Sequence, residues 1–108
     1  MIGYVTLGTN DLPRAAAFYD TLLAEIGATR LWESERGIAW GVAPDKPGLG
    51  VMKPYDGKAA TVGNGVMIAL VVDARDKVDR VHAKALALGA QGGAGAAEGR
   101  DDGSARRR

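Results

Sequence analysis

The strongest constraint on the fold is an internal repeat, found when Tyr4 is placed over Met67. Each copy then reads as an apolar strand, a polar capping turn, an amphipathic helix and a glycine that ends the helix. The two helix-ending glycines, Gly27 and Gly89, match to within one residue. The repeat predicts two related modules, each beginning with a strand that is followed by a helix.

The first copy continues into further runs of β-forming residues. Two of these runs flank a short glycine-containing turn and predict a hairpin, and a third follows a proline-bounded loop. The expected elements are a strand at 2–8, a helix at 12–26, and strands at 29–35, 38–42 and 48–53. The first module is therefore expected to be a βαβββ unit over residues 1–57, followed by a linker over residues 58–64.

The second copy is incomplete. Residues 66–72 form the most apolar run and predict a buried strand, and Asp73 is expected to cap a helix that ends at Gly89. The segment 92–108 contains no Leu, Ile, Val, Phe, Tyr or Trp, so it cannot bury enough apolar surface to offset its ordering entropy. We expect a partial second module over residues 65–91 and a flexible tail after it. Whether this truncated end is natural or follows a reading-frame slip stays open.

Composition limits the classes of function. The chain has 108 residues with 14 basic and 13 acidic side chains, which gives no argument for a nucleic-acid or membrane partner. It contains no cysteine, which excludes disulfides, thiolate metal sites and thiol nucleophiles. No apolar stretch is long enough to span a membrane. We expect one cytoplasmic domain.

Several local patterns carry a family resemblance. The run at 4–12 combines a strand with an Asp-Leu helix start, and the helix contains the pair Phe18-Tyr19. The segments 54–57 and 64–65 precede the second copy with a Pro-Tyr-Asp-Gly and an Asn-Gly sequence. Together with the repeat, these features resemble the vicinal oxygen chelate superfamily of glyoxalases, bleomycin resistance proteins and dioxygenases. The resemblance implies an α+β fold, in which paired βαβββ modules form a curved mixed sheet around a cup.

In metal-using members of that superfamily, His, Glu or Gln side chains from the first and last strands of each module hold a divalent cation. The resemblance places those positions at Tyr4, at Val51 or Met52, and at Met67 or a neighbour, and a fourth would lie on a strand not expected here. None of these residues is a ligand of the expected kind. We therefore expect no metal and no other cofactor, and a cup suited to a small apolar or aromatic molecule. The cup candidates are Tyr4, Trp32, Trp40, Met52 and Met67.

Each candidate has a plainer interpretation. Trp32 and Trp40 could equally be core or dimer-interface residues, and Tyr4 could hydrogen-bond a ligand or merely fill space. His82, the only histidine, could be a general base, but a packing role in the middle of a helix is favoured. Tyr55 lies in a loop, where a turn role is favoured over catalysis.

Three functions remain open on the sequence. The leading interpretation is a metal-free, non-catalytic binder of a small molecule. The second is an enzyme of the same superfamily, similar to lactoylglutathione lyases or dioxygenases, acting through unidentified residues. The third is a truncated product that only assembles. Because the missing strands would leave the strand at 66–72 uncovered, we expect a homodimer, with or without exchange of strands, or else a monomer that is prone to aggregate.

Overall fold

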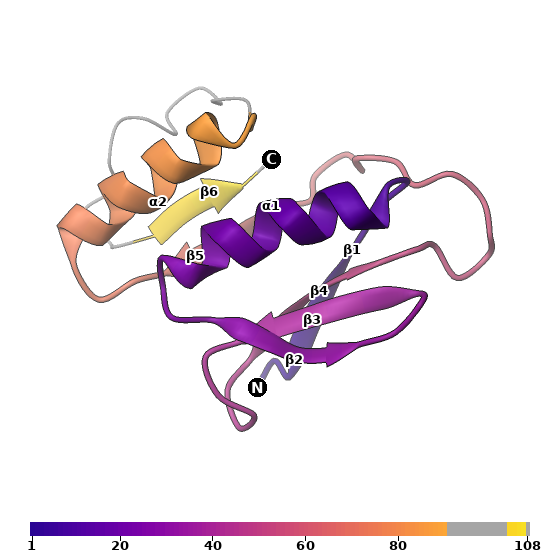
Figure 1. Cartoon of the computed structure of the whole chain (residues 1–108), viewed down its shortest axis with the longest axis horizontal. Coiled ribbons are helices and arrows are strands. Elements are labelled where there is room, and N and C mark those ends of the chain that lie inside the picture. The colour runs from indigo at the N-terminus through magenta and orange to yellow at the C-terminus, as the bar shows by residue number, and fades with distance from the viewer. Residues whose placement is uncertain (91–103, 108) are drawn as a thin grey trace. The chain divides into compact units, whose positions relative to one another are not determined.

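The computed structural model of the chain describes residues 1–90 and 104–107, which Figure 1 traces in colour. The chain divides into two compact units, Met1–Gly63 and Asn64–Arg108. The boundary between them falls inside the segment 58–64, which reads as a linker in the sequence.

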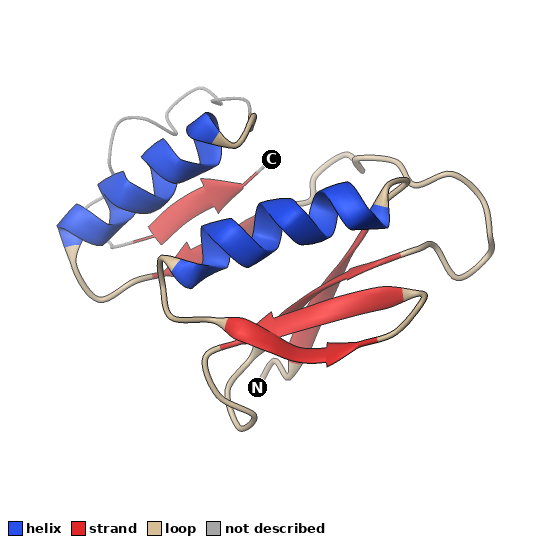
Figure 2. Ribbon diagram, viewed as in Figure 1, coloured by secondary structure: helices blue, strands red, loops and turns tan. Residues whose placement is uncertain are grey.

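The first unit contains a four-stranded sheet with the order β1-β4-β3-β2 and one helix on one of its faces (Figure 2). Its elements are β1 (Tyr4–Gly8), α1 (Leu12–Ala24), β2 (Thr29–Glu33), β3 (Gly37–Gly41) and β4 (Gly48–Met52). β1 runs parallel to β4, whereas β3 is antiparallel to both β4 and β2. The sheet is therefore mixed, and the α+β class and the βαβββ order predicted for this module are confirmed.

α1 has the termini that its sequence predicts. Pro13 lies in its first turn, and the side chain of Asp11 accepts a hydrogen bond from the backbone N–H of Arg14 at 3.1 Å. Past its last turn, Gly27 adopts a φ of +79°, a left-handed conformation that glycine tolerates best. The buried side chains of the helix are Ala16, Tyr19, Leu22 and Leu23. Burial of a large apolar side chain such as Leu22 contributes about 1.5–3 kcal/mol, so this stripe holds the helix on the sheet.

The two faces of the sheet differ because successive residues of a strand point to opposite sides. The face that α1 covers carries the core of the unit, and Trp40 and Val51 on it are each 1% exposed. The other face we call the open face. Cross-strand register assigns to it Tyr4, Thr6 and Gly8 of β1, Gly48, Gly50 and Met52 of β4, Gly37, Ala39 and Gly41 of β3, and Thr29 and Trp32 of β2.

A β-bulge in β2 decides which of its side chains reach the open face. Arg30 pairs with Trp40, but the register then shifts, so that Trp32 pairs with Ala39. Arg30 consequently lies on the helix side, and Trp32 lies on the open face. The extra residue, Leu31, has its Cδ1 atom 2.6 Å from the position that a Cβ on Gly41 would occupy, so it also lies over the open face.

The second unit contains β5 (Ile68–Val71), α2 (Arg75–Ala87) and β6 (Ser104–Arg107). β5 pairs with β6 in antiparallel register, from Ile68 opposite Arg107 to Val71 opposite Ser104. Val78 and Val81 form the buried stripe of α2, and Gly89 follows the helix with a φ of +103°. The strand and helix predicted for the second copy are thus present.

Three details of the second unit differ from the sequence expectation. The strand predicted to be buried is half-buried at Ile68 and exposed at Val71, because only one of its faces is covered. Asp73 does not cap α2, which has Ala74 as its N-cap; its carboxylate instead pairs with the Lys77 ammonium at 2.6 Å. No strand was expected in 92–108, yet β6 lies there, because backbone pairing along a strand edge needs no apolar side chains. The rest of that expected tail lies outside the described residues.

Candidate functional site

The centre of the open face is poor in side chains. Five of its positions are glycines: Gly8, Gly37, Gly41, Gly48 and Gly50. Two of them lie beneath neighbouring side chains, since Met52 extends over Gly37 and Leu31 over Gly41. Gly50, at the middle of β4, has only the methyl group of Thr6 within 3.4 Å of its potential Cβ position. The face therefore has a flat floor of backbone and methyl groups between its outer strands.

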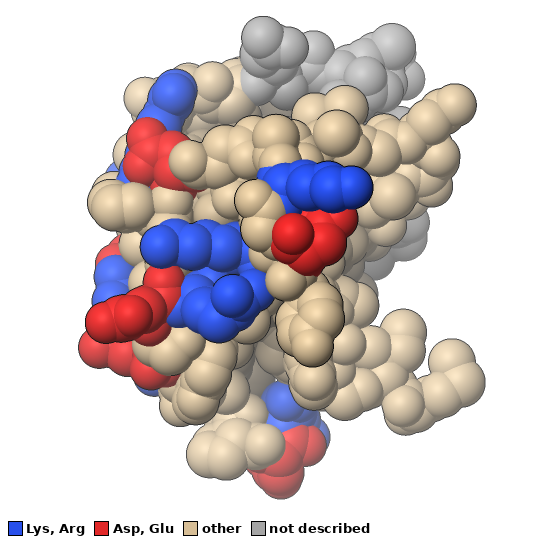
Figure 3. All heavy atoms as spheres, turned by 90° about the vertical axis from the view of Figure 1, so that its right-hand side faces the viewer, with Lys and Arg blue, Asp and Glu red and all other residues tan. Residues whose placement is uncertain are grey.

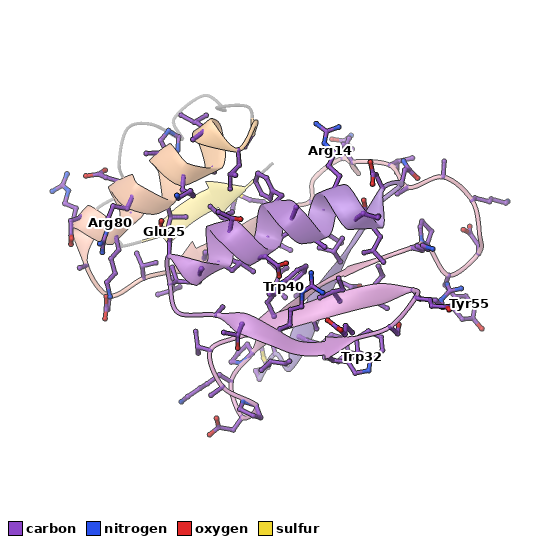
Figure 4. All side chains as sticks on the ribbon, viewed as in Figure 1. Arg14, Glu25, Trp32, Trp40, Tyr55 and Arg80 are labelled. Atoms are coloured by element: carbon purple, nitrogen blue, oxygen red, sulfur yellow. The ribbon has the colours of Figure 1, made fainter. Side chains whose placement is uncertain are left out.

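Aromatic side chains stand at both margins of this floor. Tyr4 on the edge strand β1 is 72% exposed, and Trp32 on the edge strand β2 is 50% exposed. Figure 4 shows Trp32 on the side of the sheet away from α1. The structure thus brings three of the predicted cup candidates, Tyr4, Trp32 and Met52, onto one face.

Trp40 departs from its expected place in the cup. Its side chain lies between α1 and the sheet (Figure 4), 1% exposed, and its indole N–H donates a hydrogen bond of 2.8 Å to Oδ1 of Asp20. Its ring also lies 5.5 Å, centroid to centroid, from that of Tyr19 on α1. Trp40 is therefore a core residue and cannot line the open face. The hairpin register, rather than residue type, separates it from Trp32.

Asp20 is the centre of a polar network beside Trp40. Arg30 donates to both carboxylate oxygens of Asp20, from Nε at 2.9 Å and from Nη2 at 2.7 Å, and its Nη1 donates to Glu33 at 2.8 Å. The hydrogen bonds from Arg30 are the main reason that the pKa of Asp20 lies below its usual value, although partial burial opposes them. The same bonds raise the pKa of Arg30. The network ties α1 to β2 and β3, and leaves its charges mutually compensated.

Met67, the remaining cup candidate, belongs to the second unit. It precedes β5 and is 55% exposed. Its place is therefore described only within that unit, and its role in a cup stays a prediction. His82 is half-buried within α2, which accords with the packing role favoured for it.

The superfamily resemblance implies a divalent metal, and the structure shows how the residues at the implied ligand positions are arranged. Val51 faces the helix and is 1% exposed, which leaves Met52 as the position on β4. In register, Tyr4 lies opposite Gly48 and Met52 lies opposite Gly8. The two positions are four residue steps apart along the strands, about 13 Å at 3.3 Å per residue. A phenol and a thioether at that separation cannot share an ion, so these residues do not fit the metal.

A groove lies on the opposite side of the sheet from the open face, between α1 and the turn that joins β2 to β3. It is an open groove of about 620 Å³ with an apolar floor that includes Leu12, Ala16 and Ile38. Its charged lining residues are Asp20, Arg30, Glu35 and Lys53. Two positive and two negative groups cancel, and Arg30 is already engaged by Asp20 and Glu33. The groove is therefore a weaker candidate than the open face.

Charge does not mark out another site on the face shown in Figure 3. There, acidic and basic side chains of the described residues lie beside one another rather than gathering into a field of one sign. Within the described part of the chain, no cluster of three His, Asp or Glu side chains could hold a metal ion. None of the described helices is long and apolar enough to cross a membrane.

Comparison with solved structures shows which class of protein shares this fold. A glyoxalase/bleomycin resistance protein from Albidiferax ferrireducens T118 matches 84% of this chain and 74% of its own, with a TM-score of 0.76 and 28% sequence identity. A candidate glyoxalase from Bacillus halodurans matches 98% of this chain and 92% of its own, with a TM-score of 0.68 and 20% identity. No protein-family model and no curated protein matches the sequence.

The fold is thus that of the glyoxalase/bleomycin resistance proteins. This likeness confirms the resemblance to the vicinal oxygen chelate superfamily that was noted in the sequence.

Proposed function

We propose that this protein binds a small, flat apolar or aromatic molecule on its open face, without a metal ion and without chemical conversion. One observation carries the proposal: a glycine floor lies between two exposed aromatic side chains, Tyr4 and Trp32. Exposed large apolar groups around a concave or flat site commonly mark ligand binding.

The floor favours a planar ligand for a geometric reason. No Cβ atom stands between a ring on the open face and the β4 backbone at Gly48, which is half-buried, or at Gly50, which is buried at the middle of the sheet. A ring there would be flanked by Trp32 or Tyr4, and aromatic contacts of this kind contribute about 0.5–1.5 kcal/mol beyond the area they bury. The phenol of Tyr4 adds one hydrogen-bonding group at the margin.

The absence of suitable ligand groups argues against the metal-dependent chemistry that the names of the similar structures suggest. Stabilisation of an enediolate by a bound cation needs imidazole or carboxylate ligands. Tyr4 and Met52 provide neither, and they are too far apart to act on one ion. This is why we propose a binder rather than a lyase or dioxygenase.

A thermal-shift screen tests the proposal. Naphthalene, 2-naphthol and 1-anilinonaphthalene-8-sulfonate (ANS) should each raise the melting temperature, because a ligand stabilises the folded state that it occupies. Trp32→Ala should weaken binding by removing one margin. Gly50→Ala should weaken it about fivefold or more by placing a methyl group on the floor, equivalent to about 1 kcal/mol.

The control for Gly50→Ala is Gly3→Ala, since a Cβ at Gly3 would meet no atom within 4 Å. At Gly50 the new Cβ would lie 3.3 Å from Cγ2 of Thr6, a contact that a small side-chain shift relieves, so the variant should fold. Equal shifts in the wild type, Gly50→Ala and Trp32→Ala would refute the site, and no shift with any of the three probes would refute the function.

We also propose that a second copy of the chain pairs with this one. β1 and β2 are the edges of the sheet in the first unit, and β1 carries the exposed Tyr4. Unprotected edges favour association with another strand. Light scattering coupled to size exclusion should give the mass of a dimer, and a monomeric mass across a hundredfold range of concentration would contradict it.

A further inference from the structure

The loop at residues 54–60, which follows β4, is held at its neck by one asparagine. The side-chain amide of Asn10 donates to the carbonyl of Ala60 at 3.0 Å, and its carbonyl accepts from the N–H of Ala60 at 2.7 Å. A carboxamide side chain can make this pairing because it offers an N–H donor and a carbonyl acceptor side by side. We call this two-way pairing the Asn10 clasp.

Asn10 is free to make the clasp because it does not cap α1. The sequence Asn10-Asp11 offers two residues that could start the helix, and the structure gives the capping role to Asp11. The side chain of Asn10 instead reaches a residue fifty positions along the chain. Its contact is therefore tertiary and cannot be explained by helix capping.

The clasp brings both ends of the loop together over Gly8, the last residue of β1. A Cβ on Gly8 would lie 3.1 Å from Cβ of Ala60 and 3.9 Å from Cγ of Pro54. Gly8 belongs to the open face and pairs with Met52. The closed neck of the loop thus stands at the end of the open face, next to Met52.

Other contacts hold the first half of the loop. Arg36 donates from Nη2 to the carbonyl of Pro54 at 3.2 Å, and its guanidinium lies 5.9 Å from the ring centroid of Tyr55. Within the loop, Gly57 donates its N–H to the carbonyl of Pro54 at 3.1 Å. The other half of the loop ends at Ala60. Among the hydrogen bonds of the described residues, the Asn10 clasp is what joins this half to the rest of the unit.

We propose that Asn10 is a positioning residue, which keeps the 54–60 loop closed so that Ala60 and Pro54 form a fixed end wall of the ligand-binding face. The role of the loop as an end wall depends on the proposed function, whereas the closure of the loop by Asn10 does not. A wall that is already ordered need not be ordered by the ligand, which favours affinity. When the clasp is absent, the loop is expected to open from its Ala60 end.

Limited proteolysis of the full chain tests the clasp directly. Trypsin should cleave after Lys58 about tenfold faster in Asn10→Ala, because local opening exposes that bond. Asn10→Asp keeps the acceptor for the N–H of Ala60 and loses the donor, so its rate should fall between those of Asn10→Ala and the wild type. Hydrogen exchange at the amide of Ala60 should rise in the same order.

The matched control is Asn64→Ala, since the side chain of Asn64 makes no hydrogen bond within the described part of the chain. It should cleave at the wild-type rate. Cleavage after Lys58 and exchange at Ala60 that are unchanged in both Asn10 variants would overturn the clasp, whatever the ligand does. Melting curves of all variants show whether the fold is retained.

ANS titration tests the wall. Asn10→Ala should bind ANS about three- to tenfold more weakly than the wild type, with Asn64→Ala unchanged. A loop that opens with no change in the affinity for ANS would overturn the wall. If the wild type binds neither ANS nor either of the other two probes, the proposed function fails, and the wall with it, while the proteolysis result still decides the clasp.

Discussion

Removing the carboxylate of Asp20 should destabilise the first unit chiefly through Trp40. In Asp20→Ala, the indole N–H of Trp40 loses the acceptor that lies 2.8 Å away. Trp40 is 1% exposed, so water cannot readily replace that acceptor. A buried donor left without a partner costs about 1–3 kcal/mol, and this sets the expected loss of unfolding free energy.

The ion pair between Asp20 and Arg30 should add little to that loss. Their side chains are 40% and 37% exposed, and partly exposed ion pairs are screened by water and salt. A double-mutant cycle with Trp40→Phe separates the contributions, since phenylalanine keeps the ring in the core but has no N–H. In the Trp40→Phe background, Asp20→Ala should cost about 1–2 kcal/mol less than in the wild type.

Urea denaturation followed by far-UV circular dichroism measures these differences. Asp45→Ala is the control, because Asp45 lies in an exposed loop and takes part in no ion pair of the described residues; it should change stability by less than about 0.5 kcal/mol. A coupling energy near zero would show that the hydrogen bond between Trp40 and Asp20 does not contribute, and would refute this account of the network.

Three further predictions follow from the same structure. Because the pKa of Asp20 is lowered from 3.8, its ionised form stabilises the fold above that pH and ceases to do so as the pH falls further. The difference in urea midpoint between the wild type and Asp20→Ala should therefore be constant from pH 5 to 7, as about one pH unit above the usual pKa suffices, and should narrow below about pH 4; a constant difference down to pH 2 would contradict this. Gly27→Ala should cost about 1 kcal/mol in unfolding free energy, because Gly27 has a φ of +79°, whereas Gly3→Ala should be close to neutral. Gly8→Val should speed tryptic cleavage after Lys58, since its Cβ would lie 3.1 Å from Cβ of Ala60, and a wild-type rate would show that the loop does not rest on Gly8.

Much of the first unit could be predicted from local patterns. The apolar periodicity of α1, the Asp11 and Pro13 start and the Gly27 stop depend on neighbouring residues alone, and the structure has each of them. The strands of the hairpin were also expected within a residue or two of their ends. These features follow from backbone preferences that a sequence displays directly.

The faces of the hairpin could not be predicted in the same way. An unbroken register would continue from the pair Arg30–Trp40 and place Trp32 opposite Ile38, on the helix side with Trp40. The bulge at Leu31 moves Trp32 opposite Ala39 and so turns it to the open face. β2 contains no glycine or proline that would indicate the bulge, and the contacts beside it, Arg30 with Asp20 and Leu31 over Gly41, join residues far apart in the sequence.

The Asn10 clasp could not be predicted from the sequence for a related reason. From sequence, Asn10 reads as part of a helix start, and its partner is the backbone of Ala60, which has no side-chain signature. Contacts of a side chain with a distant backbone group leave no pattern in a single sequence. The same limit applies to the glycine floor, since Gly48 and Gly50 read as weak strand residues until the register places them beside β1.

The two faces of this small sheet have different roles in the proposed function, since one carries the core and the other is the proposed binding surface. On the helix side, Trp40 and Val51 contribute burial, so substitutions there are expected to reduce stability. On the open face, Trp32 is 50% exposed and contributes little burial, so its substitution should change ligand affinity more than unfolding free energy. This separation makes the thermal-shift comparison decisive: if Trp32→Ala lowered the melting temperature of the ligand-free protein as much as Trp40→Ala, Trp32 would be a core residue and the open face would not be a binding surface.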